Sequence, residues 1–185
     1  MKALIIYQSK YGATAQYAEW LSEALALPVQ TAKESNAYTL GDAEYLVIGT
    51  SVYVGKLLLK KWLHDNQYIL KNKTLFLFIV SGGSASDKHQ QQAIISANIP
   101  GLLINQCEIF FLPGRLIKKN LSWPDRFMLK MGAMLEKDPV KKSAMHHDID
   151  AVSKTHLTEM VEAVKLYAST QHASISSKEG LSYLL

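Results

Sequence analysis

Five short apolar runs, separated by segments with helical patterns, constrain the fold of this chain more than any other feature. They span residues 3–7, 29–31, 45–49, 74–80 and 107–112, the second being the weakest. Most are continuously apolar, which is typical of parallel strands buried on both faces. Strands that alternate with helices are joined by right-handed crossovers. The pattern therefore predicts an α/β fold with a doubly wound, five-stranded parallel sheet in the strand order 2-1-3-4-5.

The helices are predicted from apolar residues that recur at helical spacing. They cover residues 13–26, 56–70 and 87–97, and a last helix is expected to start at Asp150. Residues 35–36 and 41–42 are interpreted as loop. A length of 185 residues suits one domain, which we assign to residues 1–169, with a C-terminal tail over 170–185.

Composition excludes several classes of protein. The only cysteine, Cys107, cannot form an intramolecular disulfide, which favours a reducing compartment. The N-terminal residues do not resemble a signal peptide, and no apolar stretch is long enough to span a bilayer. The six histidines lack the spacing of zinc ligands, so we predict no metal. These features predict a cytoplasmic protein, and nothing in the sequence indicates nucleic-acid binding.

The turn after the first strand has the properties of an anion site. It leads from a strand directly into a helix, whose first N–H groups are unpaired and whose dipole favours negative charge. Gly12 allows close approach of a ligand, and Ser9 and Thr14 add hydroxyl groups. The alternative is a helix capped by its own Ser and Thr side chains. The predicted phosphate-binding residues are Ser9, Lys10, Tyr11, Gly12, Ala13 and Thr14.

Two further loops follow the third and fourth strands, beside the predicted switch point of the sheet, where ligands of such folds bind. Both are small, hydroxylated and glycine-containing, so backbone amides can approach a planar ring. Tyr53 either stacks on that ring or covers the edge of the core. The residues predicted to bind the ring are Thr50, Ser51, Val52, Tyr53, Val54, Gly55, Ser81, Gly82, Gly83 and Ser84.

The pattern (S/T)-x-(T/Y)-G-x-T after the first strand resembles the FMN-phosphate loop of flavodoxins. Together with the two ring loops, the resemblance covers residues 1–112 and implies a flavodoxin-like fold with FMN as cofactor. One departure concerns residues 81–86, which contain no aromatic residue, whereas flavodoxins commonly sandwich the flavin between aromatics. One face of the ring is therefore expected to be open to a substrate.

An insertion separates the fifth strand from the last helix, and we assign it to residues 113–147. Its 35 residues hold eight Lys or Arg and only three acids, so it carries all of the net positive charge of +4. Residues 124–135 have a helical pattern with an apolar face that Lys and Arg residues flank, as in an interfacial amphipathic helix. The alternatives are a solvated basic loop, or a helix packed on the sheet with Met as core filler.

The W-x-D-R-F-M core of the insertion, within an FMN-loop scaffold, resembles the menaquinone-dependent protoporphyrinogen IX dehydrogenases. That resemblance implies a porphyrinogen donor in haem synthesis and a quinone acceptor at a peripheral membrane site, on the cytoplasmic face of the inner membrane. The flavin supplies the chemistry, so no catalytic acid or base is assigned. The candidate substrate or membrane residues are Arg115, Lys118, Lys119, Trp123, Arg126, Phe127 and Lys130.

Three alternatives stay open on the sequence. One is a flavodoxin-type electron-transfer protein, and another is a quinone reductase with a different donor. The third is an FMN-free interaction domain, because a fold does not fix a function. A homodimer is also compatible with the sequence.

Overall fold

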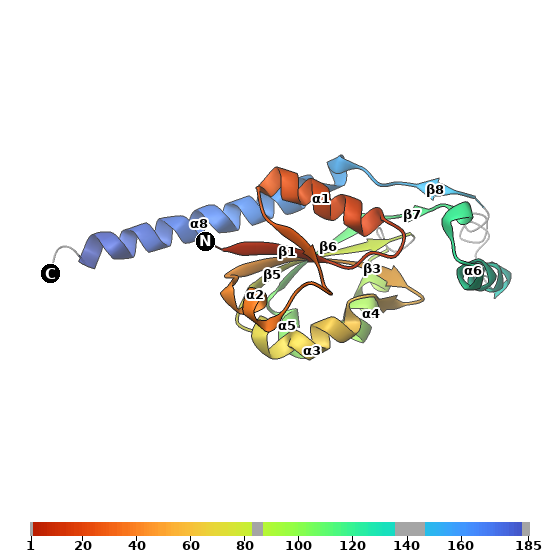
Figure 1. Cartoon of the computed structure of the whole chain (residues 1–185), viewed down its shortest axis with the longest axis horizontal. Coiled ribbons are helices and arrows are strands. Elements are labelled where there is room, and N and C mark those ends of the chain that lie inside the picture. Colours follow the sequence, from red (N-terminus) through yellow and green to blue (C-terminus); the bar gives the residue numbers. More distant parts are fainter. Residues whose placement is uncertain (1, 83–86, 136–146, 183–185) are drawn as a thin grey trace.

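The computed structural model describes residues 2–82, 87–135 and 147–182, with side chains described as far as Gln171. Its main sheet has five parallel strands: β1 (Ala3–Tyr7), β2 (Val29–Thr31), β3 (Tyr45–Tyr53), β5 (Thr74–Ser81) and β6 (Cys107–Pro113). Their order is β2-β1-β3-β5-β6 (Figure 1). The short extra strand β4 (Lys56–Leu57) lies off this path. When β4 is left out of the count, the observed order is the predicted 2-1-3-4-5, so the α/β fold and its doubly wound order are confirmed.

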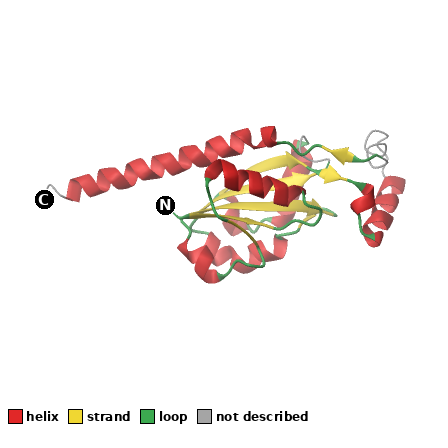
Figure 2. Cartoon of the chain, turned by 45° about the horizontal axis from the view of Figure 1, so that its top comes forward, coloured by secondary structure: helices red, strands yellow, loops and turns green. Residues whose placement is uncertain are grey.

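Helices cover both faces of the sheet (Figure 2). One face packs against α1 (Ala13–Leu25) and α8 (Thr158–Ser182). The other packs against α2 (Ala37–Asp42), α3 (Lys60–Leu70), α4 (Lys88–Asn98) and α5 (Gly101–Ile104). The strands lie between two hydrophobic layers, which explains why their sequences are continuously apolar.

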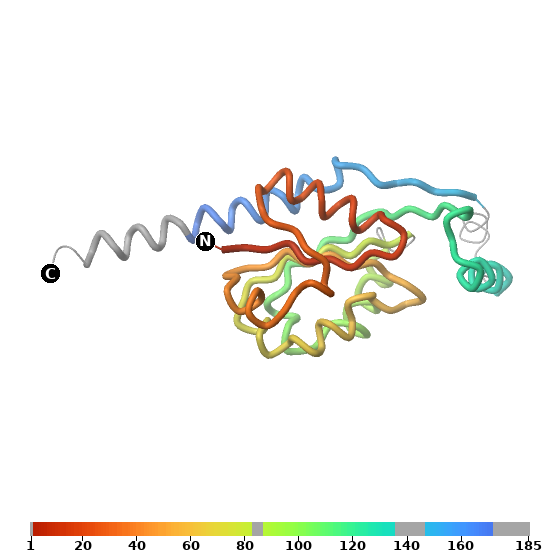
Figure 3. Tube along the Cα trace, in the orientation of Figure 1, coloured from red at the N-terminus to blue at the C-terminus, as the bar shows by residue number. Residues whose placement is uncertain are grey.

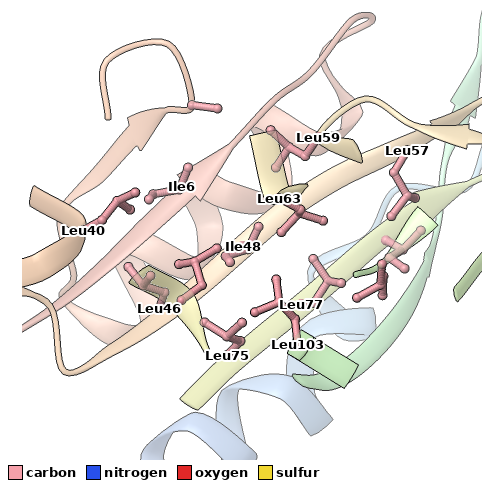
Figure 4. Close-up of a cluster of buried hydrophobic side chains, with 14 of the residues drawn as sticks. Ile6, Leu40, Leu46, Ile48, Leu57, Leu59, Leu63, Leu75, Leu77 and Leu103 are labelled. Atoms are coloured by element: carbon pink, nitrogen blue, oxygen red, sulfur yellow. The ribbon is translucent and has the colours of Figure 1, made fainter. Parts of the chain in front are cut away.

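Alternate residues of each central strand enter opposite cores. Leu46 and Ile48 of β3 join the core beneath α3, with Leu75 and Leu77 of β5 beside them (Figure 4). Their neighbours in sequence face α1 and α8, where Tyr45, Phe76 and Tyr167 meet edge to face with ring centroids 5.5–6.1 Å apart. The cores hold the strands in fixed register, which positions the loops at their carboxyl ends.

A hairpin corrects the prediction that a helix starts at residue 56. β4 turns back antiparallel to the end of β3, pairing Tyr53 with Lys56, and α3 begins only at Lys60. The two residues between the strands, Val54 and Gly55, both have positive φ, at 50° and 72°. A type I′ hairpin turn requires positive φ at both of these residues. The sequence does not suggest such a turn, because a β-branched Val disfavours positive φ.

We expect Val54→Asn to raise the free energy of unfolding by about 1 kcal/mol, because a left-handed conformation costs an L-residue about 1–2 kcal/mol and Asn-Gly suits this turn. Urea unfolding of the two proteins measures the difference. The side chain is 62% exposed, so little packing is lost in the exchange. An unchanged or lower stability would contradict the assigned turn.

Two other boundaries differ from prediction. Residues 41–42 belong to α2 rather than to a loop. A reciprocal capping box between Asn36 and Thr39 stabilises the start of this helix, and the helix continues to Asp42. The last helix does not start at Asp150: that residue pairs in β8 (Ile149–Asp150), and a 3₁₀ turn, η2 (Lys154–Leu157), precedes α8. His147 is exposed and precedes β8 rather than a helix.

The insertion leaves the sheet beside β6 and returns next to its own start. β7 (Arg115–Leu116) pairs antiparallel with β8, and between them lie η1 (Lys118–Asn120) and α6 (Trp123–Leu135). In the trace of Figure 3, α6 lies beyond the end of the sheet rather than on either face. The helix predicted over residues 124–135 is confirmed as α6. No helix within the described ranges is both long and apolar enough to cross a bilayer.

Candidate functional site

The three predicted loops meet at the carboxyl ends of β1, β3 and β5. They line a pocket of about 90 Å³ together with Gly114 and Arg115 from the start of the insertion. Residues 9–11, 13–14, 51–53 and 80–82 supply the rest of its lining, and the predicted Gly12 is not part of it. Segments far apart in sequence are therefore brought together at the switch point, where a doubly wound sheet binds its ligand.

The start of α1 offers an open anion site. Gly12 is the N-cap, with φ 87°, and no side chain caps the helix. Ser9 instead accepts a hydrogen bond from the Gly12 amide at 3.1 Å, which folds the turn back on itself. The arrangement disagrees with the alternative of a self-capped helix. The unpartnered helix end fits a phosphate monoester without a Lys or Arg ligand.

The last residue of β5 adds a buried polar atom that has no partner among the described residues. Ser81 is 5% exposed, and its Oγ has no hydrogen-bond partner among the described residues. It lines both the pocket and a groove of about 400 Å³, which Val52 and Gly82 also share and which continues to Gln90, Ala93 and Ile94 of α4. Buried hydroxyls are almost always paired, so a ligand with polar atoms fits this place.

Not every predicted ring residue faces the pocket. Thr50 is fully buried and accepts a hydrogen bond from the amide of Leu59 at 3.2 Å, so its hydroxyl holds the chain after β4. Val54 and Gly55 form the hairpin turn, and Gly55 lines only the groove. Gly83 and Ser84 lie outside the described residues.

Asp125 of α6 is the residue that sequence analysis missed. Its side chain is only 7% exposed, and Lys10 Nζ lies 2.7 Å from its Oδ2. The hydroxyls of Tyr11 and Tyr53 donate hydrogen bonds to the same carboxylate. We call Lys10, Tyr11, Tyr53 and Asp125 the Asp125 cluster. Its signal in the sequence was weak, because an acid in the first turn of a helix is ordinarily explained by the helix dipole.

Lys10 is the central cation of this cluster. Its Nζ lies 3.7 Å from the centroid of the Tyr53 ring, so one face of that ring is already covered. Burial alone would lower the pKa of Lys10, but hydrogen bonds to Asp125 and Tyr53 outweigh it and raise the pKa above its ordinary value of 10.5. Lys10 therefore stays charged at neutral pH. Only the other face of Tyr53 is left to stack on a ring.

The predicted cations of the insertion fall into two groups. Arg115 lies at the pocket, where it pairs with Asp150 and donates to Gln16, both at 2.8 Å. The others surround a separate apolar pocket of about 350 Å³ with a floor of Leu121, Leu129 and Ala133. The cations around this second pocket are Lys118, Lys119, Arg126 and Lys130. Arg126 also donates to the carbonyls of Lys119 and Leu121, at 2.7 and 3.0 Å.

The outer side of α6 is apolar and exposed. Trp123 and Phe127 are 80% and 56% exposed and stack on each other, with ring centroids 6.3 Å apart. The methionines are not core filler, because Met131 and Met134 are 40% and 70% exposed. The alternative of a helix packed on the sheet is therefore wrong for this face.

Cys107 offers no reactive thiol, and no metal-binding cluster lies within the described ranges. Burial raises the pKa of the Cys107 thiol to about 12, so it stays protonated and unreactive. No group of His, Cys, Asp and Glu there could hold a metal ion.

The chain was compared with known families, curated proteins and solved structures. A family model described as a flavodoxin domain matches residues 4–143. No curated protein matches. Flavodoxin 2 from Bacillus cereus shares 18% identity over 62% of this chain and 85% of its own, with a TM-score of 0.48. The rubredoxin oxygen:oxidoreductase from Desulfovibrio gigas shares 14% over 86% of this chain and 37% of its own, with a TM-score of 0.46.

The family match covers well over half of the chain, and the open helix start and the unpaired Ser81 hydroxyl fit a phosphorylated flavin. The chain therefore belongs to the flavodoxin domain family, with FMN as its cofactor and flavin-based electron transfer or oxidoreduction as its function.

Proposed function

We propose that this protein is an FMN-dependent dehydrogenase that oxidises a porphyrinogen, protoporphyrinogen IX, and passes the electrons to a membrane quinone. The observation that carries the proposal is the two-sided placement of α6. Its inner side contacts the cofactor loops through Asp125, while its outer side exposes a continuous apolar face. A helix built in this way can bring a flavin next to a membrane that holds an apolar electron acceptor.

The basic pocket beside α6 supports an anionic, flat substrate. Lys118, Lys119, Arg126 and Lys130 surround an apolar floor, which suits a macrocycle that carries propionates. The pocket shares no residue with the 90 Å³ cofactor pocket. In this proposal, the cations hold the carboxylates while the apolar part of the substrate extends toward the open face of the flavin.

The reaction divides between cofactor and protein. A bound flavin would supply the redox chemistry: oxidation of the porphyrinogen to the porphyrin releases six electrons and six protons, which three quinones would take up to become three quinols. The protein's own residues bind and orient. Backbone amides at the start of α1 hold the phosphate, Tyr53 and the loop at Ser81 frame the ring, and the insertion positions substrate and membrane.

The deciding experiment uses FMN-loaded protein in anaerobic vesicles that contain menaquinone. Protoporphyrinogen IX is added, and formation of the fluorescent porphyrin is followed. We expect porphyrin to form only when both FMN and quinone are present. Failure of porphyrinogen to reduce the flavin would overturn the proposal, and reduction by another donor would favour an electron-transfer protein or a quinone reductase.

The apolar face of α6 gives a separate prediction for membrane binding. We expect Phe127→Glu to weaken binding to anionic vesicles at least about tenfold, because burying one aromatic side chain contributes about 1.5–3 kcal/mol. Vesicle co-sedimentation measures the effect. Tyr68→Glu on α3 is the matched control, since Tyr68 is also an exposed aromatic, at 69%, but lies on another helix. Equal binding by the two variants would contradict a membrane role for α6.

A further inference from the structure

We propose that Asp125 is a positioning residue that couples the insertion to the flavin site, so that FMN binding and the docking of α6 stabilise each other. The inference uses the FMN cofactor but does not depend on which donor or acceptor the protein uses. It begins from the contacts of one buried carboxylate. Those contacts join residues 10–11, 53 and 125, which come from three different parts of the fold.

A buried carboxylate needs partners, and Asp125 has three. At 7% exposure, its charge is matched by the ammonium of Lys10 at 2.7 Å and by two tyrosine hydroxyls. Ser122, one turn earlier on the insertion, donates its backbone amide to the hydroxyl of Tyr11 at 3.3 Å. Removing one member of such a cluster leaves the others unsatisfied, which makes the contact cooperative.

The same three partners lie at the cofactor pocket. Lys10, Tyr11 and Tyr53 all line it, whereas Asp125 contacts them from outside the lining. Through the Tyr53 hydroxyl and the ammonium over its ring, Asp125 fixes the orientation of the aromatic side chain that can stack on the flavin. Asp125 therefore acts on the cofactor through Tyr53 and Lys10, without being part of the pocket wall.

Within the described ranges, the hydrogen bonds that join α6 to the sheet loops go to Tyr11 and Tyr53. Besides the Asp125 cluster, Met128 Sδ lies 3.7 Å from the Tyr53 hydroxyl. Figure 1 shows the helix beyond the end of the sheet, reached through the two short strands β7 and β8. Its outer face is exposed, and these contacts tie its position to residues that line the proposed cofactor pocket. When FMN binds and orders Lys10 and Tyr53, it lowers the entropy cost of docking α6. By thermodynamic linkage, docked α6 raises the affinity for FMN by the same factor.

Hydrogen exchange of α6 with and without saturating FMN tests the coupling. We expect FMN to slow exchange over residues 123–135 at least tenfold in the wild type, and to have no effect on α6 in Asp125→Asn. Asp148→Asn is the matched control. It removes the same charge just after the insertion, where Asp148 accepts a hydrogen bond from the Lys118 amide at 2.9 Å, so it should keep the FMN effect.

The midpoint potential of the bound flavin separates positioning from a purely structural contact. Asp125 neutralises Lys10 beside the flavin, so its replacement by Asn exposes a positive charge that favours the reduced, more negative cofactor. We expect the reduced-to-oxidised ratio at a fixed potential to rise at least tenfold, which is about 30 mV for a two-electron couple. Asp148→Asn should leave this ratio unchanged.

Three results would overturn the proposal. FMN could leave α6 exchange unchanged in the wild type, or slow it equally in Asp125→Asn. FMN could also accelerate the exchange, which would mean that the cofactor and Asp125 compete for Lys10. If Asp125→Asn does not fold, Tyr11→Phe combined with Tyr53→Phe removes only two hydroxyls, and the FMN effect on α6 must then fall at least threefold.

Discussion

Gly12→Val should abolish FMN retention, with at least a hundredfold loss of affinity. Gly12, the N-cap of α1, has φ 87°, a conformation that is especially unfavourable for a β-branched residue. A new Cβ would meet no atom within 4 Å, so the fold can survive the change. The substitution instead distorts the turn whose amides we propose to hold the phosphate, and each hydrogen bond to a charged group contributes about 1.5–3 kcal/mol.

Titration of the FMN-free protein, followed by flavin fluorescence, measures this loss. Gly41→Val is the control, because Gly41 lies in α2, has no positive φ and also has open space around its Cβ position. The strain at residue 12 should cost about 1–2 kcal/mol in urea unfolding, a small part of a typical total stability of 5–15 kcal/mol. Wild-type affinity in Gly12→Val would exclude the start of α1 as the phosphate site.

Gly49→Ala should cost about 3 kcal/mol or more of folding stability. Gly49 pairs with Phe78 across the two central strands, and a Cβ at residue 49 would lie 2.1 Å from Cζ of that ring. Phe78 is fully buried, so the ring cannot move into solvent. Overpacking of a core ordinarily costs about 1–3 kcal/mol, and this clash is severe because it lies in the middle of the sheet.

Urea unfolding compares Gly49→Ala with Gly101→Ala, a control at the start of α5 where a new Cβ meets no atom within 4 Å. Replacing Phe78 by Leu in the Gly49→Ala background should recover part of the loss, because the smaller side chain makes room for the methyl group. If Gly49→Ala unfolds at the wild-type midpoint, the close approach of Gly49 to the Phe78 ring is wrong.

Local sequence determined the layout of the sheet. The apolar runs at 45–49 and 74–80 are readable because both faces of a central parallel strand are buried, and the strand order follows from their number and alternation. The turn at residues 9–14 was recognisable for a similar reason. A strand, a glycine and a helix start adjoin in the sequence, so the phosphate-site geometry is local.

Features that depend on unusual backbone or on distant partners could not be predicted in this way. The Val54–Gly55 hairpin needs positive φ at a valine, against its propensity, and it is held by pairing with β3. The late start of α8 has the same origin, because Asp150 pairs with Arg115 in β7 and β8 rather than starting a helix.

The sequence by itself determined the sheet, its order and the three loops that line the candidate cofactor pocket, because those depend on burial and on neighbours in the chain. Only the tertiary structure decided what the insertion does beside them. Asp125 becomes a buried partner of Lys10, Tyr11 and Tyr53 only when segments more than seventy residues apart are folded together. The physical reason is that the sequence does not show whether a carboxylate is buried or exposed. That depends on its desolvation cost and on the partners that offset this cost, which only the folded chain brings together.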